Sequence, residues 1–170
     1  MGQSVVEFEP IRSDQRRAYR SLIRDVKLAL LSEIGARAVY DHIERRARDE
    51  ELARFAGEMN REGVEIVERV QELLRGMGAR PRRTSFRRRA LARILVHGAR
   101  FTGARPVLRL IRHAEETAGR WYGDYALFLV RIGDHGRARA FHELRAKKER
   151  RALVMGAWVD NIARRGDRSL

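Results

Sequence analysis

The sequence contains no cysteine among its 170 residues. This absence excludes disulfide bonds, thiolate metal sites and a cysteine nucleophile. The chain has only three prolines and no long run of glycine and serine, so we expect no flexible linker. It also has no stretch of 18 apolar residues, which excludes a plain membrane-spanning helix. The first ten residues, MGQSVVEFEP, lack the apolar segment of a secretory signal.

Length and composition indicate one folded domain. The chain is long enough for a single hydrophobic core and too short for two ordinary domains. Its hydrophobic content of 44% is typical of globular proteins, although 35% of the residues are charged. We therefore predict a single domain over residues 1–170, with its core at about 14–164.

The charge is strongly positive and unevenly distributed. The formal net charge is +14, and 34 of the 37 basic residues are arginine. Between Ala79 and His113 there are 11 arginines and no acidic residue. A general arginine bias can reflect codon composition, but this local excess favours an anionic partner: lipid headgroups, nucleic acid or an acidic protein.

Apolar residues recur with the period of an α-helix through most of the chain, and strand patterns are almost absent. Capping and breaking residues divide the pattern into segments. The predicted long helices run from Asp14 to about Ala47, from after Asp49 to about Gly76–Gly78, from Pro106 to Gly133, and from after Asp134 to about Arg164. A short basic amphipathic helix is predicted between the second and third of these, at about Phe86–His97. The sequence therefore predicts an all-α, antiparallel four-helix bundle with short connections.

Glutamates occupy positions in these helices where apolar residues are expected. Glu33, Glu62 and Glu115 each lie midway along the apolar stripe of a different helix. A carboxylate buried alone is strongly unfavourable, so a proton, a basic side chain or a metal must neutralise it. One such glutamate is typically a satisfied polar group in the core. Three of them at the same depth would converge, and two divalent ions between inward carboxylates are a known solution in four-helix bundles.

Two segments resemble the demethoxyubiquinone hydroxylases, which are ferritin-like di-iron proteins. Residues 33–40, EIGARAVY, are similar to the metal-binding motif in the first helix of that family. Residues 114–117, AEET, followed by Trp121 and Tyr122, are similar to its third-helix motif, with glutamate and tyrosine seven residues apart. The exit from the second helix, residues 78–81, is also similar, and the resemblance covers about Leu22 to Ala163.

The resemblance implies a ferritin-like fold and a di-iron enzyme that activates O₂ and hydroxylates a quinone ring in ubiquinone biosynthesis. The implied metals are two iron ions, or manganese. The family ligands are a glutamate, a Glu-x-x-His pair, a second glutamate and a second Glu-x-x-His pair. Matched residue by residue, they correspond to Glu33, Glu62, Glu115 and Glu149, while the two histidine positions hold Glu65 and Ala152.

The loss of both histidines leaves two hypotheses open. Glu65 is a possible substitute ligand, since carboxylate-rich sites suit Fe²⁺ or Mn²⁺. Alternatively the metals are gone, and Arg145 or Lys148 neutralises the inward carboxylates. Taken alone, Glu149 is typical of a solvated charge, because basic residues flank it on both sides. His142 is the one histidine on the same side as Glu149.

Two tyrosines and the basic segment complete the candidate site. Tyr40 and Tyr122 are core aromatics whose hydroxyls we expect to bond inward glutamates, and Tyr122 would also support metal chemistry beside the site. The segment Arg80–Arg112 predicts contact with an anionic membrane, while no nucleic-acid-binding motif accompanies its charge. Its alternative is a solvated arginine face whose apolar side packs on the bundle.

Three functions follow as hypotheses. The first is a quinone hydroxylase, whose substrate is a quinone or another apolar small molecule. The second is a degenerate bundle without catalysis that binds lipid or protein, which the missing histidines and the basic surface favour. The third is iron oxidation or storage. The expected location is cytoplasmic, with peripheral attachment to the inner face of the membrane.

Overall fold

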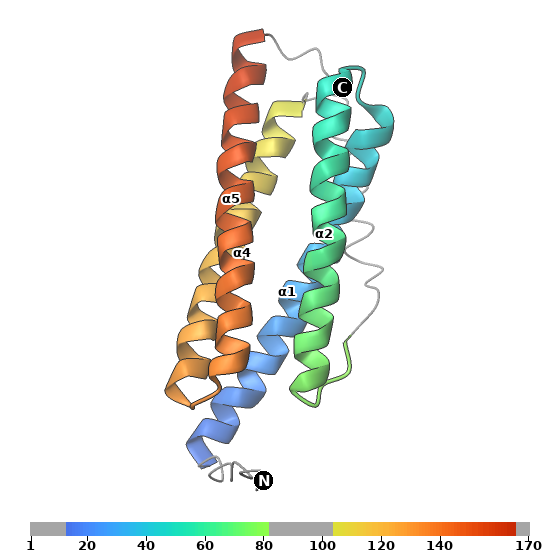
Figure 1. The fold of residues 1–170 in the computed structure, drawn as a ribbon. Helices are drawn as coiled ribbons and strands as arrows, with labels where there is room; N and C mark the ends of the chain where they lie inside the picture. The colour runs from blue at the N-terminus through green and yellow to red at the C-terminus, as the bar shows by residue number, and fades with distance from the viewer. Residues whose placement is uncertain (1–12, 82–103, 166–170) are drawn as a thin grey trace, which may run out of the picture.

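The computed structural model describes residues 13–81 and 104–165 of the chain. Within these ranges it contains only helices: α1 (Ser13–Arg46), α2 (Glu50–Gly76), α4 (Ala104–Arg131) and α5 (His135–Arg165). Figure 1 shows them packed lengthwise against one another. The predicted all-α four-helix bundle is therefore confirmed. The short helix predicted at about 86–97 lies outside the described residues.

Aspartate caps and glycine turns set the helix ends close to the predicted positions. The Asp49 carboxylate accepts hydrogen bonds from the backbone N–H groups of Glu51 and Leu52, at 2.9 and 3.1 Å, which caps α2. At the other end of α2, Gly78 has φ of +73°, a conformation that glycine adopts without strain. Gly133 has φ of +78° and ends α4 in the same way.

Neighbouring helices run in opposite directions. Figure 1 shows α1 and α5 rising while α2 and α4 descend. Two ion pairs between α2 and α5 agree with this direction, since Glu62 pairs with Arg150 and Glu65 with Lys147. The helices α2 and α4 therefore run in the same direction, and α4 begins at the end of the bundle opposite to the end of α2.

The hydrophobic core consists of two clusters. One cluster holds residues of the first half of α1, the second halves of α2 and α4 and the first half of α5, including Leu30, Leu74 and Phe141. The other holds the opposite ends of the helices, including Phe55 and Met155. Four charged residues of the described chain are also buried: Glu33, Glu115, Lys148 and Arg151.

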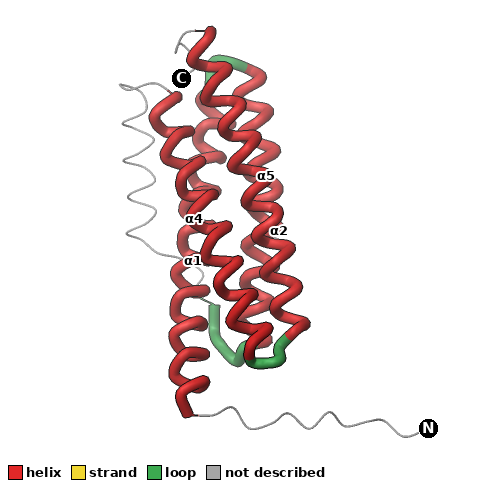
Figure 2. The backbone as a smooth tube through the Cα atoms, turned by 90° about the vertical axis from the view of Figure 1, so that its left-hand side faces the viewer, coloured by secondary structure: helices red, strands yellow, loops and turns green. Residues whose placement is uncertain are grey.

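The described loops are short and lie at the ends of the bundle, as the tube in Figure 2 shows. Along most of the bundle the walls are therefore helical. Within the described residues, no helix is both long and apolar enough to cross a membrane.

Candidate functional site

The buried charges come from three helices. Glu33 lies on α1, Glu115 on α4, and Lys148 and Arg151 on α5. Their exposed fractions are 3%, 2%, 1% and 1%. Two carboxylates and two basic groups thus share an interior from which water is almost fully excluded. Such groups are tolerated only when they are paired and hydrogen-bonded.

Lys148 joins the two carboxylates. Its ammonium nitrogen Nζ lies 2.5 Å from Oε2 of Glu33 and 2.6 Å from Oε2 of Glu115. Both interactions are charge-assisted hydrogen bonds, the strong class in proteins. The ammonium therefore stands between two inward carboxylates from facing helices. Lys148 is one of the two basic residues that the sequence offered for this neutralising role.

Arg151 adds the second positive charge. Its Nη2 lies 3.0 Å from Oε1 of Glu115, and its guanidinium lies over the ring of Tyr40, 5.2 Å from the centroid. This position allows a cation–π interaction in a desolvated site. Its Nε and Nη1 atoms are buried and have no hydrogen-bond partner among the described residues. Sequence reasoning did not place Arg151 in the interior.

Two tyrosine hydroxyls form hydrogen bonds with the same glutamates, each from the opposite helix. The Tyr40 hydroxyl donates to Oε1 of Glu115 at 2.9 Å, and the Tyr122 hydroxyl donates to Oε1 of Glu33 at 3.0 Å. Glutamate and tyrosine are seven residues apart in both α1 and α4, and the two helices are antiparallel. Each tyrosine therefore lies opposite the glutamate of the other helix. The prediction that these hydroxyls bond inward glutamates is confirmed.

The charges and the burial shift the ionisation of these groups. Burial by itself raises the pKa of the Glu115 carboxyl, but Lys148 and Arg151 outweigh it, and the pKa lies below its ordinary value of 4.5. Burial, together with the adjacent glutamates, raises the pKa of Tyr40 and of Tyr122 well above 10.0. Glu115 is therefore charged at neutral pH, and both tyrosines remain neutral hydrogen-bond donors.

Glu62 does not join this cluster. Its side chain is 25% exposed, and Oε1 lies 2.5 Å from Nη2 of Arg150 on the surface between α2 and α5. Its Oε2 is buried and without a partner among the described residues. The neighbouring residue of α2, Gly63, is buried beside the cluster: an added Cβ there would lie 2.8 Å from Cγ of Arg37 and 3.8 Å from Nη1 of Arg151. Absence of a side chain there leaves room for both arginines.

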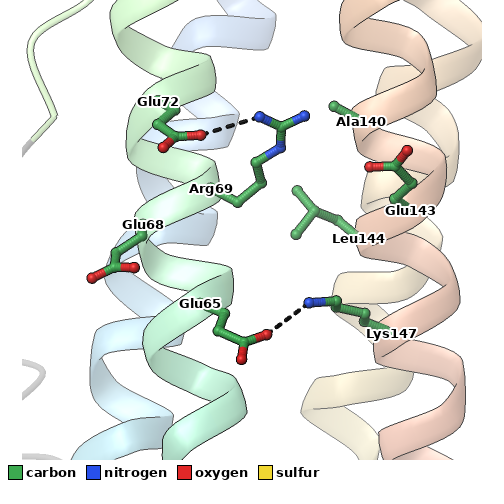
Figure 3. A pocket seen from close by; sticks show the side chains of 8 residues that line it. All are labelled: Glu65, Glu68, Arg69, Glu72, Ala140, Glu143, Leu144 and Lys147. Carbon is green, nitrogen blue, oxygen red and sulfur yellow. Dashed lines mark hydrogen bonds and ion pairs between the residues drawn. The ribbon is translucent and has the colours of Figure 1, made fainter.

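Glu65 lies in an open groove between α2 and α5, shown in Figure 3. Its Oε2 pairs with Nζ of Lys147 at 2.9 Å, and both side chains are exposed. The groove has a volume of about 270 Å³. Its lining residues are Glu65, Glu68, Arg69, Glu72, Ala140, Glu143, Leu144 and Lys147. Glu65 therefore lies in this exposed groove, where Lys147 pairs with its charge, and not in the interior.

Glu149 is exposed as well. Its Oε1 lies 2.7 Å from Nε of Arg145, one turn earlier on α5. It lines a second groove, of about 330 Å³, between α4 and α5, together with Ala152. His142 is also exposed on α5. The structure thus brings together Glu33 and Glu115, and places the other three glutamates predicted as ligands on the surface or at its edge.

As arranged, this donor set does not fit two divalent ions. Among the described residues, no group of three or more histidine, aspartate or glutamate side chains is placed to hold a metal. The two carboxylates that do meet, Glu33 and Glu115, already share the Lys148 ammonium. A cation at that point would also lie beside the buried Arg151 guanidinium. Like charges in a low-dielectric interior oppose such binding.

Searches against protein-family models, curated proteins and solved structures gave no match for this chain.

Proposed function

We propose that this chain is a ferritin-like bundle without a catalytic metal centre, and that it functions by binding rather than by oxidation. The observation that carries the proposal is the position of Lys148, whose ammonium bonds both inward carboxylates. In ferritin-like metalloproteins, inward carboxylates hold the metal ions. Here the ammonium group of Lys148 takes the place of those ions between Glu33 and Glu115.

The fold supports the ferritin-like part of the proposal. The helices α2 and α4 run in the same direction. A four-helix bundle whose second and third helices are parallel is of the long-crossover class, to which ferritin-like bundles belong. The resemblance of residues 33–40 and 114–122 to the demethoxyubiquinone hydroxylases points the same way.

Electrostatics supports the metal-free part. Lys148 and Arg151 match the charges of Glu33 and Glu115, so the cluster is neutral as it stands. A divalent ion that displaced the ammonium would leave a buried, unpaired Lys148. Removal of one partner from a buried ion pair typically costs about 3–5 kcal/mol. Metal binding would have to overcome this cost in addition to its own desolvation.

The proposed binding partner is an anionic surface. The net charge of +14 attracts such partners, and the local arginine excess between Ala79 and His113 concentrates the attraction. The quinone hydroxylase and the iron oxidase or storage protein remain predictions of the sequence, and both require bound metal. Metal dependence therefore separates them from the present proposal.

The test combines metal analysis with thermal unfolding. Protein purified without chelator is analysed for iron and manganese, and its melting temperature is measured at neutral pH under anaerobic conditions with and without Fe²⁺ or Mn²⁺. We expect no stoichiometric metal and an unchanged melting temperature. A metal that bound the folded state would raise it by mass action. A rise that disappears in Glu115→Gln would overturn the proposal in favour of a surviving carboxylate centre.

A further inference from the structure

We propose that the groove between α4 and α5 binds a small amphipathic carboxylate, a molecule with one negative charge and a short alkyl chain. The inference rests on the proposed binding function and adds a ligand class to it. The groove has a volume of about 330 Å³. Ligand cavities typically measure about 300–1,000 Å³, so this groove has room for a small molecule and not for a long lipid. Its lining residues are Arg112, Glu116, Arg120, Glu149, Ala152 and Leu153.

The close packing of α4 on α5 forms the groove. Gly119 of α4 leaves room for α5, because an added Cβ there would lie 3.5 Å from Cβ of Lys148. Two turns earlier on α4, Arg112 reaches across to α5, where its Nη1 lies 3.2 Å from the point that a Cβ on Gly156 would occupy. These contacts set the register of the two helices. Both walls of the groove are therefore helical, and its shape does not depend on a loop.

One basic group in the groove has no acidic partner. The two acidic residues of the groove each pair with an arginine of their own helix, at 2.9 Å for Glu116 and 2.7 Å for Glu149. Within the described residues Arg120 forms no ion pair, and its Nη2 donates to the neutral hydroxyl of Thr117 at 3.1 Å. One positive charge is thus left unmatched. It favours a ligand with a single negative charge over a doubly charged phosphate ester.

The apolar part of the groove lies on α5. Leu153 is 75% exposed, the highest value among the large hydrophobic side chains that the described chain exposes. Ala152 lies beside it in the same wall. In the register of the two helices, Leu153 lies roughly 8 Å along the bundle axis from Arg120. An alkyl chain can therefore cover Leu153 while its carboxylate accepts two parallel hydrogen bonds from the Arg120 guanidinium.

This combination favours a small amphipathic anion over other occupants of the groove. A nucleic acid would satisfy Arg120 but would leave Leu153 exposed. In a symmetric dimer the same patch would lie on both sides of the contact, so neither copy would supply a negative charge for Arg120. An alkyl carboxylate supplies both the charge and the apolar surface.

The test uses sodium octanoate as the probe, with two matched compounds that each lack one half of it. Acetate has the carboxylate without the chain, and octan-1-ol has the chain without the charge. The full chain, labelled with ¹³C in its leucine methyl groups, is titrated with each compound and followed by NMR. The methyl signals of Leu153 are assigned by their absence from the Leu153→Ala variant.

We expect octanoate to shift the Leu153 methyl signals in a saturable manner that fits one site. Acetate should give no saturable shift, and octan-1-ol should bind at least tenfold more weakly than octanoate. Arg120→Gln should weaken octanoate binding on the order of tenfold. The matched control Arg54→Gln removes one exposed arginine from α2 and should leave the affinity unchanged. The three-compound comparison needs no variant, so the result does not depend on the folding of either one.

Four results would overturn the inference. Equal weakening by Arg120→Gln and Arg54→Gln would indicate attraction by the net charge of the chain and not by the groove. Octan-1-ol that binds as tightly as octanoate would remove the role of Arg120. Saturable shifts at other leucines without a shift at Leu153 would place the ligand elsewhere on the protein. The absence of saturable octanoate binding would remove the ligand class, whereas the metal experiment would still decide the metal-free core by itself.

Discussion

The Lys148 ammonium and the Glu33 carboxylate lie 2.5 Å apart in the interior, where both side chains are almost fully buried. Lys148 belongs to the α4–α5 hairpin and Glu33 to the α1–α2 hairpin. The hydrogen bonds from Tyr40 to Glu115 and from Tyr122 to Glu33 cross the same boundary. The two hairpins are thus joined at mid-height by polar contacts, between apolar clusters above and below. A shift of one hairpin along the other would break every one of these contacts.

Replacement of Lys148 by methionine should destabilise the fold strongly. The change retains most of the volume but leaves the Glu33 carboxylate buried without a cation. Loss of one partner of a buried ion pair costs about 3–5 kcal/mol. For a domain of this size the melting temperature should fall by roughly 10 °C. Thermal unfolding followed by circular dichroism measures the change.

The adjacent residue supplies the control for that substitution. Lys147 carries the same side chain, and its ion pair with Glu65 is exposed. Exposed pairs contribute about 0–1 kcal/mol, so Lys147→Met should lower the melting temperature by a few degrees at most. Equal losses in the two variants would contradict the assignment of Lys148 to the interior.

Acid should unfold the protein partly through Glu115. Its folded-state pKa lies below the ordinary value of 4.5, because Lys148 and Arg151 outweigh the effect of burial. A lowered folded-state pKa gives stability that is present above pH 4.5 and is lost as the pH falls through the lower folded value. The Glu115→Gln variant should be less stable at neutral pH and should depend less on pH in the acid range. Urea unfolding of both proteins from neutral to acid pH measures how the free energy of unfolding of each depends on pH. Parallel curves for the two proteins would exclude this role of Glu115.

Alkaline pH should act through the buried tyrosines. The pKa of Tyr40 and of Tyr122 is raised, first by burial and then by the neighbouring glutamates. A raised folded-state pKa means that the stabilisation is complete below pH 10.0 and is lost as the pH rises above that value toward the folded one. The ultraviolet absorbance of tyrosinate should therefore rise together with unfolding. Independent titration of both tyrosines in a chain that stays folded would contradict their burial.

The Tyr→Phe variants should separate the contribution of each hydroxyl to stability from that of its aromatic ring. Tyr40→Phe removes a donor to the charged Glu115, and Tyr122→Phe removes a donor to Glu33. A hydrogen bond to a charged group contributes about 1.5–3 kcal/mol, so each variant should lose about that much. Tyr125→Phe is the control, because Tyr125 makes edge contacts with the rings of Tyr122 and Phe141 that a phenylalanine retains. Denaturant unfolding should show a much smaller loss for the control.

The helix boundaries and the burial of Glu33 and Glu115 could be predicted from sequence, because caps and apolar periodicity are local signals. Which residue of α2 faces the buried charges could not be predicted from the sequence. Both Glu62 and Gly63 fit a spacing of three or four residues after Met59. The choice depends on Arg37 and Arg151, which pack against the bare backbone of Gly63.

The charged run of α5 shows a second limit of local patterns. Leu144 and Met155 are buried apolar positions, and a helical stripe that joins them passes through Lys148 and Arg151. That stripe is visible in the sequence, but a basic residue in a charged run is usually solvated. Only the carboxylates on facing helices make burial of these two residues favourable. This information lies more than thirty residues away along the chain, so a window of one helix cannot contain it.

The last prediction concerns replacement of the whole polar centre. Removal of one partner from a buried ion pair strongly destabilises a protein. Replacement of the whole pair by well-packed apolar residues of similar volume, in contrast, is often neutral or stabilising. The combined variant removes every charged group of the cluster and the two hydroxyls bonded to it. Its substitutions are Glu33→Leu, Glu115→Leu, Lys148→Met, Arg151→Met, Tyr40→Phe and Tyr122→Phe.

We expect this variant to be at least as stable as the parent chain, although Lys148→Met alone costs about 3–5 kcal/mol. Such strong non-additivity is the signature of groups that share one network. Near-neutral single variants would instead indicate that water reaches the centre and solvates the charges. A combined variant that loses the summed cost of its parts would show that the polar contacts contribute net stability. Denaturant unfolding of the single and combined variants under one set of conditions distinguishes these results.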